Sequence, residues 1–353
     1  MRLKEYLKKL TPQEYEGKTL TCLPSSYDPR DFKYNKLLTH INYMETTPVV
    51  IDYRPNLPPV FDQKDRGSCV ACATAWTPKA FAEINEGCFP ADGLSASFLY
   101  SMCKSMDGTP EEEGTNLKVA MQVLQQYGIC PEEIMPYSTL TNLESPNVPI
   151  VSELAKLQAK QYKISTYAQL CSTTDVGRSG LLTTIRQALK REGPFIMALL
   201  VCSNFAPDPI TNKLPLPQGF IQGGHAIGIV GDLPEIKCLI MRNSWGSDWG
   251  IDGYAYLPYE WLTSYVNIDD LGIMYHIFEA WVATDIITPK MANKIEITPN
   301  ENVMLVDGIE ISLDQSAFIT DKGRTVMPVR SLATNMGYLV GWQNGKVILT
   351  RPS

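Results

Sequence analysis

The chain has 353 residues, 44% of them hydrophobic and 20% charged, and its 31 basic and 38 acidic side chains give a net charge near -7. This composition is typical of a globular protein, and the length predicts about two domains. The acidic balance argues against a nucleic acid or an anionic membrane surface as the partner.

The N-terminal stretch, residues 1–48, is polar and rich in turn-forming residues, so we expect an appendage to the core that begins with an amphipathic helix over residues 1–10. That first segment lacks the continuous apolar stretch of a secretory signal. The longest purely apolar run, residues 195–202, is too short to span a membrane. We therefore expect no signal peptide, no membrane span, and a cytoplasmic location or release by an unconventional route.

Helices dominate the first half of the predicted elements. After a short strand over residues 49–54, an alanine-rich helix is expected over residues 68–84, kinked or divided at Pro78 because proline cannot donate a backbone hydrogen bond. Apolar residues at helical spacing predict a second helix over residues 115–127, and a third is expected over residues 180–191.

Strands dominate the second half. Short apolar runs over residues 195–201, 226–230, 238–242 and 254–257 are separated by Gly, Pro and Asp. Because helices come first and strands afterwards, the sequence predicts an α+β fold class.

The last part of the chain reads as a small separate unit. A linker-like passage with two Thr-Pro pairs leads to a predicted hairpin over residues 303–306 and 309–313, joined by an Asp-Gly turn. A short helix over residues 329–336 and a last strand over residues 346–350 complete it. We expect this unit to be a second, smaller α+β domain.

Cysteine and histidine limit the chemistry. Nine cysteines, an odd number without an export signal, predict buried thiols rather than a disulfide framework. A lone Cys-x-x-Cys pair, Cys69 and Cys72, could be a redox motif, but no second pair follows to hold zinc. Cys72 is expected to pack in the core, and His40 and His276 to be structural or on the surface. We expect no metal and no cofactor.

Cys69 is the better candidate for a nucleophile. It begins the alanine-rich helix, where unpaired backbone N–H groups and the helix dipole stabilise a thiolate and lower the pKa of the thiol. His225 follows two glycines that leave room for a substrate, and Asn243 ends the next predicted strand. A thiolate with an imidazole beside it is the usual arrangement for nucleophilic catalysis.

These motifs occur in a recognisable order. Gln63 stands six residues before Cys69, Gly-His-Ala follows at residues 224–226, and Asn-Ser-Trp-Gly at residues 243–246. In this, the chain resembles the papain-like cysteine peptidases, with similarity over residues 49 to about 285.

The resemblance implies a cysteine endopeptidase that works through a thioester. Cys69 would attack the peptide carbonyl, His225 would pair with the thiolate and then protonate the leaving amine, and Asn243 would orient His225. The Gln63 side chain and the Cys69 backbone N–H would form the oxyanion hole.

The resemblance also implies the fold and the substrate. A helical lobe and a β-rich lobe would meet at a cleft that binds an extended peptide or protein. Gly114, Gly224 and Trp245 would bind substrate, and Trp245 would also cover the histidine–asparagine hydrogen bond.

Two parts of the chain depart from the usual family pattern. Arg66 stands where many members carry a disulfide-bonded cysteine. Residues 1–48 lie where the family carries an inhibitory pro-segment but are shorter than usual, so latency is a hypothesis.

The tail, residues 296–353, resembles the small N-terminal repeat domain of copper amine oxidases, also known from bacterial surface proteins. Val306-Asp307-Gly308 and the stretch from Thr325 to Ala333 carry this likeness. The tail contains no histidine, so we expect no copper there, and attachment to a cell surface or wall is the implied role. The predicted division is therefore an extension over 1–48, a peptidase domain over 49–288 and this domain over 296–353.

Two other readings stay open. A catalytically silent papain-like scaffold could bind a partner or cell-wall material, with the tail supplying adhesion. An active enzyme could instead pass the acyl group of the same thioester to an amine, as a transpeptidase does.

Overall fold

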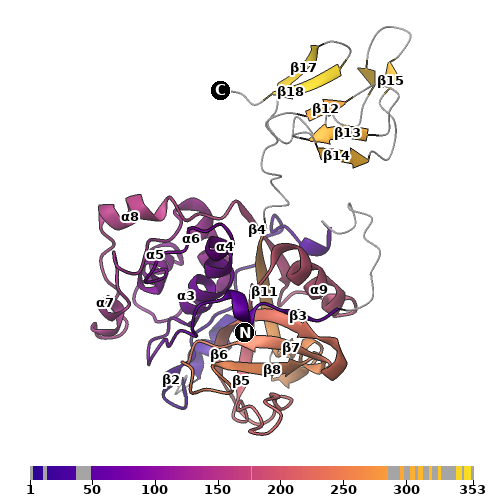
Figure 1. Ribbon diagram of the computed structural model, residues 1–353. Coiled ribbons are helices and arrows are strands. Elements are labelled where there is room, and N and C mark those ends of the chain that lie inside the picture. The colour runs from indigo at the N-terminus through magenta and orange to yellow at the C-terminus, as the bar shows by residue number, and fades with distance from the viewer. Residues whose placement is uncertain are drawn as a thin grey trace. The chain divides into compact units, whose positions relative to one another are not determined.

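The computed structural model describes residues 3–10, 14–36, 49–175, 177–269 and 271–284, and beyond them the backbone of seven short strands. The chain forms two compact units, Met1–Thr284 and Asp285–Ser353 (Figure 1).

The helix predicted over residues 68–84 is present but interrupted. It consists of α3 (Cys69–Thr74), the π-helical turn η2 (Ala75–Lys79) and α4 (Ala80–Asn85). Pro78 lies inside η2 and supplies no backbone N–H, so the chain widens for one turn instead of ending. This confirms the predicted disturbance.

Four more helices complete the helical lobe. The helix predicted over residues 115–127 is α6 (Leu117–Gln126), whose N-terminus is capped by the Asn116 side chain. It packs beside α5 (Ala96–Met106), which Ser95 caps in the same way. Helix α5 was not predicted from the sequence, nor were α7 (Ser138–Thr141) and α8 (Glu153–Ala159). Buried residues of these helices and of α3 belong to one apolar core, which extends to Leu200 and Trp281 of the β-rich lobe.

The β-rich lobe is built on one seven-stranded antiparallel sheet with the order β4-β11-β5-β6-β7-β8 and β3 added beside β6. Five of its strands were predicted, although β3 is shorter and β6 longer than expected. The helix predicted over residues 180–191 is α9 (Leu181–Glu192), which packs against β4, β6 and β11. The strands are β3 (Ile51–Asp52), β4 (Thr166–Cys171), β5 (Phe195–Cys202), β6 (Ile221–Leu233), β7 (Cys238–Arg242), β8 (Tyr254–Pro258) and β11 (Ile277–Thr284).

Smaller elements lie around this frame. A hairpin that the sequence analysis did not predict joins β9 (Tyr265–Ile268) to β10 (Gly272–Tyr275). Three 3-10 turns are η1 (Arg54–Asn56), η3 (Pro234–Ile236) and η4 (Tyr259–Leu262).

The N-terminal appendage begins with the predicted helix, α1 (Leu3–Lys9), which buries Leu3 and Leu7. A small hairpin of β1 (Glu14–Tyr15) and β2 (Lys18–Thr19) follows. The chain then runs on through residues 20–25, called the cleft segment below because it lies between the two lobes.

The C-terminal unit contains a five-stranded antiparallel sheet with the order β14-β13-β12-β18-β17 and a separate pair, β15 with β16. The hairpin and the last strand were predicted, whereas the expected helix at 329–336 lies outside the described residues. The strands are β12 (Ile295–Ile297), β13 (Val303–Val306), β14 (Ile309–Ser312), β15 (Phe318–Ile319), β16 (Thr325–Val326), β17 (Leu339–Gln343) and β18 (Lys346–Thr350). Across the described parts of the chain, no helix has the length and apolar character needed to cross a bilayer.

Candidate active site

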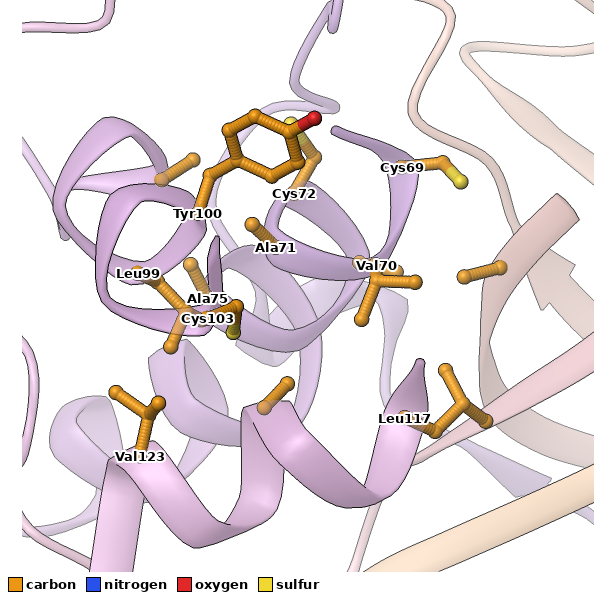
Figure 2. Packing of buried hydrophobic residues seen from close by; sticks show 14 of the residues in the cluster. Cys69, Val70, Ala71, Cys72, Ala75, Leu99, Tyr100, Cys103, Leu117 and Val123 are labelled. Carbon is orange, nitrogen blue, oxygen red and sulfur yellow. The ribbon is translucent and has the colours of Figure 1, made fainter. Parts of the chain in front are cut away.

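The two cysteines at the start of α3 point in different directions. Cys69 is the first residue of the helix, and Figure 2 shows its sulfur turned away from the packed residues of the helical lobe. Cys72 lies on the other side, where its sulfur is 3.5 Å from the Ser68 hydroxyl and 3.8 Å from that of Tyr137. The prediction that Cys72 packs in the core is therefore confirmed.

His225 and Asn243 are joined by a hydrogen bond within the β-rich lobe. His225 lies in β6, fully buried, and its Nε2 is 2.7 Å from Asn243 Oδ1. The same oxygen accepts the Ser244 backbone N–H, so it acts as the acceptor and Nε2 must carry the proton. In the neutral ring Nδ1 is then the free base, and among the described residues it has no hydrogen-bond partner.

Aromatic rings cover this pair. The Trp245 ring lies 4.7 Å from the His225 ring, and the Tyr15 ring of the N-terminal hairpin stacks on Trp245 with ring centroids 5.9 Å apart and an interplanar angle of 18°. Both aromatic side chains are buried. Water is thereby kept from the histidine, and the hydrogen bond to Asn243 lies in a medium of low polarity.

The Gln63 side chain is held at both ends by the lobes, and its amide also contacts the N-terminal appendage. Its Oε1 accepts the Ser244 hydroxyl at 2.8 Å, and its Nε2 donates to the Arg66 carbonyl at 2.9 Å. The same Nε2 reaches the carbonyl of Thr19 at 3.3 Å. A carbonyl of the N-terminal appendage thus lies on the amide that would serve as an oxyanion donor.

The cleft segment bonds to both lobes as an added strand would. The Cys22 N–H donates to the Gly224 carbonyl and the Leu23 N–H to the Thr115 carbonyl, each at 2.9 Å. The bridges that residues 21 and 22 form with these walls are parallel. At the sulfur of Cys69 the segment presents the backbone N–H of Thr21.

Glycines make room for the segment. A Cβ placed on Gly224 would lie 2.0 Å from the Cys22 carbonyl oxygen, and one on Gly114 would lie 2.0 Å from that of Thr21. Gly114 also has a φ of +86°, which favours glycine. The two glycines predicted to bind substrate are thus in contact with a bound stretch of chain.

The protonation states of the pair differ from the expectation. Burial raises the pKa of Cys69 to about 11, although the N–H groups of Ala226, Val70 and Thr21 act to lower it. Burial also lowers the pKa of His225 to about 4, against the effect of its bond to Asn243. The predicted low pKa of the thiol is therefore wrong for this arrangement, because loss of water around the sulfur outweighs the helix N-terminus.

Comparisons with known proteins agree with this geometry. The family model described as papain family cysteine protease matches residues 47–268, more than half of the chain. The chain belongs to the papain family of cysteine proteases. A second family model, the copper amine oxidase N-terminal domain, matches residues 252–350.

Individual relatives of this peptidase are distant. An uncharacterized peptidase C1-like protein of Acanthamoeba polyphaga mimivirus is 28% identical, over 61% of this chain and 69% of that protein. The cathepsin B-like protein CP2 of Giardia intestinalis is 26% identical, over 69% and 81%. Among solved structures, xylellain, a cysteine protease from Xylella fastidiosa, has a TM-score of 0.60 and 25% identity, over 76% of this chain and 97% of that one.

The proform of cathepsin B from Trypanosoma congolense shares the fold, with a TM-score of 0.52 and 20% identity over 76% of this chain and 86% of that one. The predicted papain-like two-lobed α+β fold is confirmed, and the protein is a cysteine peptidase of the hydrolase class.

An ion pair joins the loop just before Cys69 to the cleft wall of the helical lobe. Arg66 Nε lies 3.3 Å from Glu113 Oε1, and these side chains are only 5% and 14% exposed. The guanidinium also donates to the carbonyls of Leu143 and Asn147 at 2.7 and 2.9 Å. Many family members have a disulfide-bonded cysteine at the position of Arg66. In this chain Arg66 links the same loop to its surroundings by an ion pair and hydrogen bonds instead.

The remaining candidates have structural surroundings or lie elsewhere. His276 is buried with Nδ1 3.2 Å from the Ser264 hydroxyl, and His40 lies outside the described residues. All nine cysteines are free, and eight are buried, while Cys88 is exposed. The described residues contain no cluster of three or more His, Cys, Asp or Glu side chains placed to hold a metal ion.

The residues that fill the cleft were not predicted, because no local pattern in the sequence marks them. They are Tyr15, which stacks on Trp245, Thr19, whose carbonyl accepts from Gln63, and Thr21, whose N–H faces the Cys69 sulfur. Glu279 was missed too. A charged residue inside the apolar run of β11 was the available signal, since charged groups are seldom buried without a reason.

Proposed function

We propose that this peptidase cleaves peptide bonds through a thioester on Cys69, with His225 and Asn243 completing a catalytic triad. The observation that carries the proposal is the bond between His225 Nε2 and Asn243 Oδ1, which leaves Nδ1 as the free base. The residue after His225, Ala226, directs its N–H at the Cys69 sulfur, so the nucleophile and the histidine strand are in contact.

The chemistry follows from those positions. His225 Nδ1 takes the proton of the Cys69 thiol, and the thiolate attacks the substrate carbonyl carbon. The resulting imidazolium gives that proton to the leaving amine as the C–N bond breaks, which leaves an acyl thioester. Water, deprotonated by the same nitrogen, then attacks the thioester, and the acid product and the thiol are released.

Negative charge on the carbonyl oxygen needs donors that are already in place. Gln63 Nε2, held through Ser244 and the Arg66 carbonyl, is one such donor, and the backbone N–H of Cys69 is the other. Trp245 would exclude water from the histidine, while Gly114 and Gly224 would bind the substrate backbone.

The same contacts support an extended substrate and an endopeptidase. The appendage follows the cleft from Tyr15 over Trp245, past the sulfur, to Leu23 at the Thr115 carbonyl. Chain therefore fits on both sides of the nucleophile, as it must when a bond inside a polypeptide is cut.

We further propose that the enzyme as described is latent. The cleft segment presents a backbone N–H to the Cys69 sulfur, where a substrate would present a carbonyl carbon. The Thr19 carbonyl, next to the segment, accepts the Gln63 side-chain N–H. The buried Cys69 thiol and the buried His225 imidazole are both neutral near pH 7. Release of the segment would hydrate the pair and allow the ion pair to form. The proposal keeps the predicted domains, an N-terminal extension over residues 1–48, a peptidase domain over 49–288 and a small domain over 296–353. The last of these would serve attachment.

An epoxide-type thiol trap followed by peptide mapping tests the site. We expect the label on Cys69, loss of peptidase activity in step with labelling, and no label in a Cys69→Ala variant. A Cys72→Ala variant is the matched control and should be labelled normally. Label on Cys72 in the unaltered chain would overturn the assignment.

Latency has its own measurement. The full chain should hydrolyse a peptide with a lag, whereas a chain that begins after residue 48 should start at full rate. Equal rates from the first seconds would refute latency and leave the triad standing.

A further inference from the structure

Tyr137 carries a buried hydroxyl that bonds to Gln63, the residue proposed to supply the oxyanion donor. The Tyr137 side chain is 7% exposed, and its O–H donates to the Gln63 backbone carbonyl at 2.8 Å. Its ring packs edge-on against Phe61, with the ring centroids 4.9 Å apart. The two bonded residues are 74 positions apart in the chain, so the fold makes this contact and the local chain does not.

The proton positions around Tyr137 follow from the kinds of atom that it contacts. A carbonyl oxygen can only accept, so the single hydroxyl proton of Tyr137 points at Gln63. The Ser68 hydroxyl lies 2.5 Å from the Tyr137 oxygen and must therefore donate to it. Burial raises the pKa of Tyr137, so the hydroxyl keeps its proton. Two consecutive hydrogen bonds thus lead from Ser68, the residue before Cys69, through Tyr137 to Gln63.

Gln63 is held from the β-rich lobe as well. Its backbone N–H donates to the Ser244 carbonyl at 2.8 Å, and its Oε1 accepts the Ser244 hydroxyl at 2.8 Å. Ser244 follows Asn243, the hydrogen-bond partner of His225. Gln63 therefore lies between two anchors, Ser244 beside the histidine pair and Tyr137 beside the start of the nucleophile's helix.

The Tyr137 hydroxyl is the short bond to the Gln63 carbonyl. The Arg66 backbone N–H reaches the same oxygen only at 3.4 Å. Without the hydroxyl, Gln63 would be anchored mainly by Ser244 and would be free to shift relative to Cys69. An oxyanion donor acts only within hydrogen-bond distance of the oxygen that becomes charged, and a displacement of about 1 Å can lower a rate by about 100-fold.

We propose that Tyr137 is a positioning residue for the oxyanion hole. Its hydroxyl fixes Gln63 relative to α3, so that the Gln63 side-chain amide and the Cys69 backbone N–H can donate to the same carbonyl oxygen. Tyr137 acts through Gln63 and takes no part in the chemistry itself. The inference rests on the proposed peptidase function.

Tyr137→Phe removes the hydroxyl and keeps the ring against Phe61. Two quantities are measured on the same sample of the full chain, kcat/KM for a peptide and the initial rate at which iodoacetamide alkylates Cys69, followed by peptide mapping. Alkylation needs the thiolate but forms no oxyanion, because the sulfur displaces iodide from a saturated carbon. Both quantities scale with the fraction of molecules with an open cleft, so latency cancels in their ratio.

Tyr137→Phe should lower the ratio of hydrolysis to alkylation by about 10-fold, through kcat with KM within about twofold, while alkylation itself changes less than about twofold. The matched control is Tyr53→Phe, which removes a comparable bond, from the Tyr53 hydroxyl to the Leu189 carbonyl at 2.9 Å. The control should keep the ratio within about twofold. Titration with the epoxide-type thiol trap corrects for misfolded molecules.

Two further variants show whether Tyr137 acts through Gln63. In a Gln63→Ala background, Tyr137→Phe should lower the ratio by less than about threefold, because the donor that it positions is gone. Ser68→Ala, which removes only the donor to the Tyr137 oxygen, should lower the ratio by about threefold in the unaltered background.

The outcomes separate the two proposals. A ratio that is unchanged in both Tyr137→Phe and Ser68→Ala overturns the role of Tyr137 and leaves the peptidase standing. Equal losses of hydrolysis and alkylation overturn it too, and so does a 10-fold loss that persists in the Gln63→Ala background. If the unaltered chain hydrolyses no peptide and takes no label on Cys69, the peptidase proposal is overturned and the inference with it.

Discussion

Two largely buried carboxylates border the cleft, and they are held in different ways. Glu113, in the wall of the helical lobe, faces the guanidinium of Arg66, which belongs to the loop just before Cys69 in the same lobe. Glu279, in the β-rich lobe, faces the backbone N–H and hydroxyl of Ser25 from the cleft segment.

The difference indicates what each carboxylate does. A partner within the wall would stay if the cleft segment were released, so Glu113 and Arg66 fix the shape of the loop before Cys69. A partner on the segment would leave with it, so the bonds of Glu279 tie the N-terminal appendage to the β-rich lobe. The first kind of contact holds a wall together, whereas the second holds the segment in the cleft.

The largest effect is expected from breaking the fixed pair. Arg66→Met leaves the Glu113 carboxylate without its cation and the carbonyls of Leu143 and Asn147 without donors. The free energy of unfolding should fall by about 3–5 kcal/mol, as measured by urea denaturation.

The matched control is the double variant Arg66→Met with Glu113→Leu. It replaces the ion pair with apolar side chains and should recover more than half of that loss. A double variant no more stable than Arg66→Met alone would contradict the assigned role of the pair.

Gln63 has partners of both kinds, the Ser244 hydroxyl and the Arg66 carbonyl in the lobes and the Thr19 carbonyl in the N-terminal appendage. Gln63→Ala should lower kcat by about 100-fold with little change in KM, because a pre-placed oxyanion donor acts mainly in the transition state. Steady-state kinetics with the trap-titrated enzyme measures this. Ser244→Ala, which removes only the hydroxyl at Oε1, serves as the control and should cost less than about tenfold.

Weaker binding of the cleft segment should change activity by a smaller factor, and should raise it instead of lowering it. Cys22→Asp places a carboxylate in a fully buried site close to Cys69 and Glu279, so the segment should be bound less tightly. The initial rate of the full chain should rise about tenfold, read from progress curves, while Cys22→Ser should leave the lag within about twofold. An unchanged lag in Cys22→Asp would show that the segment does not control access.

The smallest effect concerns a third carboxylate, Glu132, whose Oε1 accepts the backbone N–H of Tyr137. Burial raises its pKa to about 7 from 4.5, although the Tyr137 N–H acts to lower it. Between about pH 4.5 and 7 the folded protein therefore keeps a proton that the unfolded chain releases, and stability falls as pH rises through that window.

Glu132→Gln should remove this dependence. After allowance for partial exposure, we expect a gain of about 1 kcal/mol at pH 8 and little change at pH 4.5, seen as a rise of a few degrees in Tm at the higher pH alone. An equal gain at both pH values would mean that titration of this group is not the cause.

Much of the frame could be predicted from local pattern. The helices at 115–127 and 180–191 have strong 3.6-residue periodicity, and the runs that became β5 and β7 are short, apolar and bounded by turn residues. Helix α5 was missed although its polar residues Ser97, Ser101 and Lys104 recur at helical spacing, and the structure buries all of residues 96–104, these polar side chains included. The order of the motifs, rather than periodicity, indicated the peptidase.

The contents of the cleft could not be predicted in this way. The contacts of the segment with Gly224 and Thr115 join parts of the chain that are far apart in sequence, and their parallel direction leaves no trace in either stretch. The prediction of a low pKa for the Cys69 thiol was wrong for the same reason. Its helix position was readable, but the cover that removes water from the sulfur comes from Thr21 and other distant residues.

The direction of the segment has a practical consequence for inhibitor design. A peptide copied from residues 20–25 and kept in the same N-to-C order would satisfy the Gly224 and Thr115 carbonyls while offering the sulfur no carbon to attack. Such a compound needs no reactive warhead and should resist hydrolysis by the enzyme that it blocks. Reversing its sequence order would turn the same scaffold into a candidate substrate.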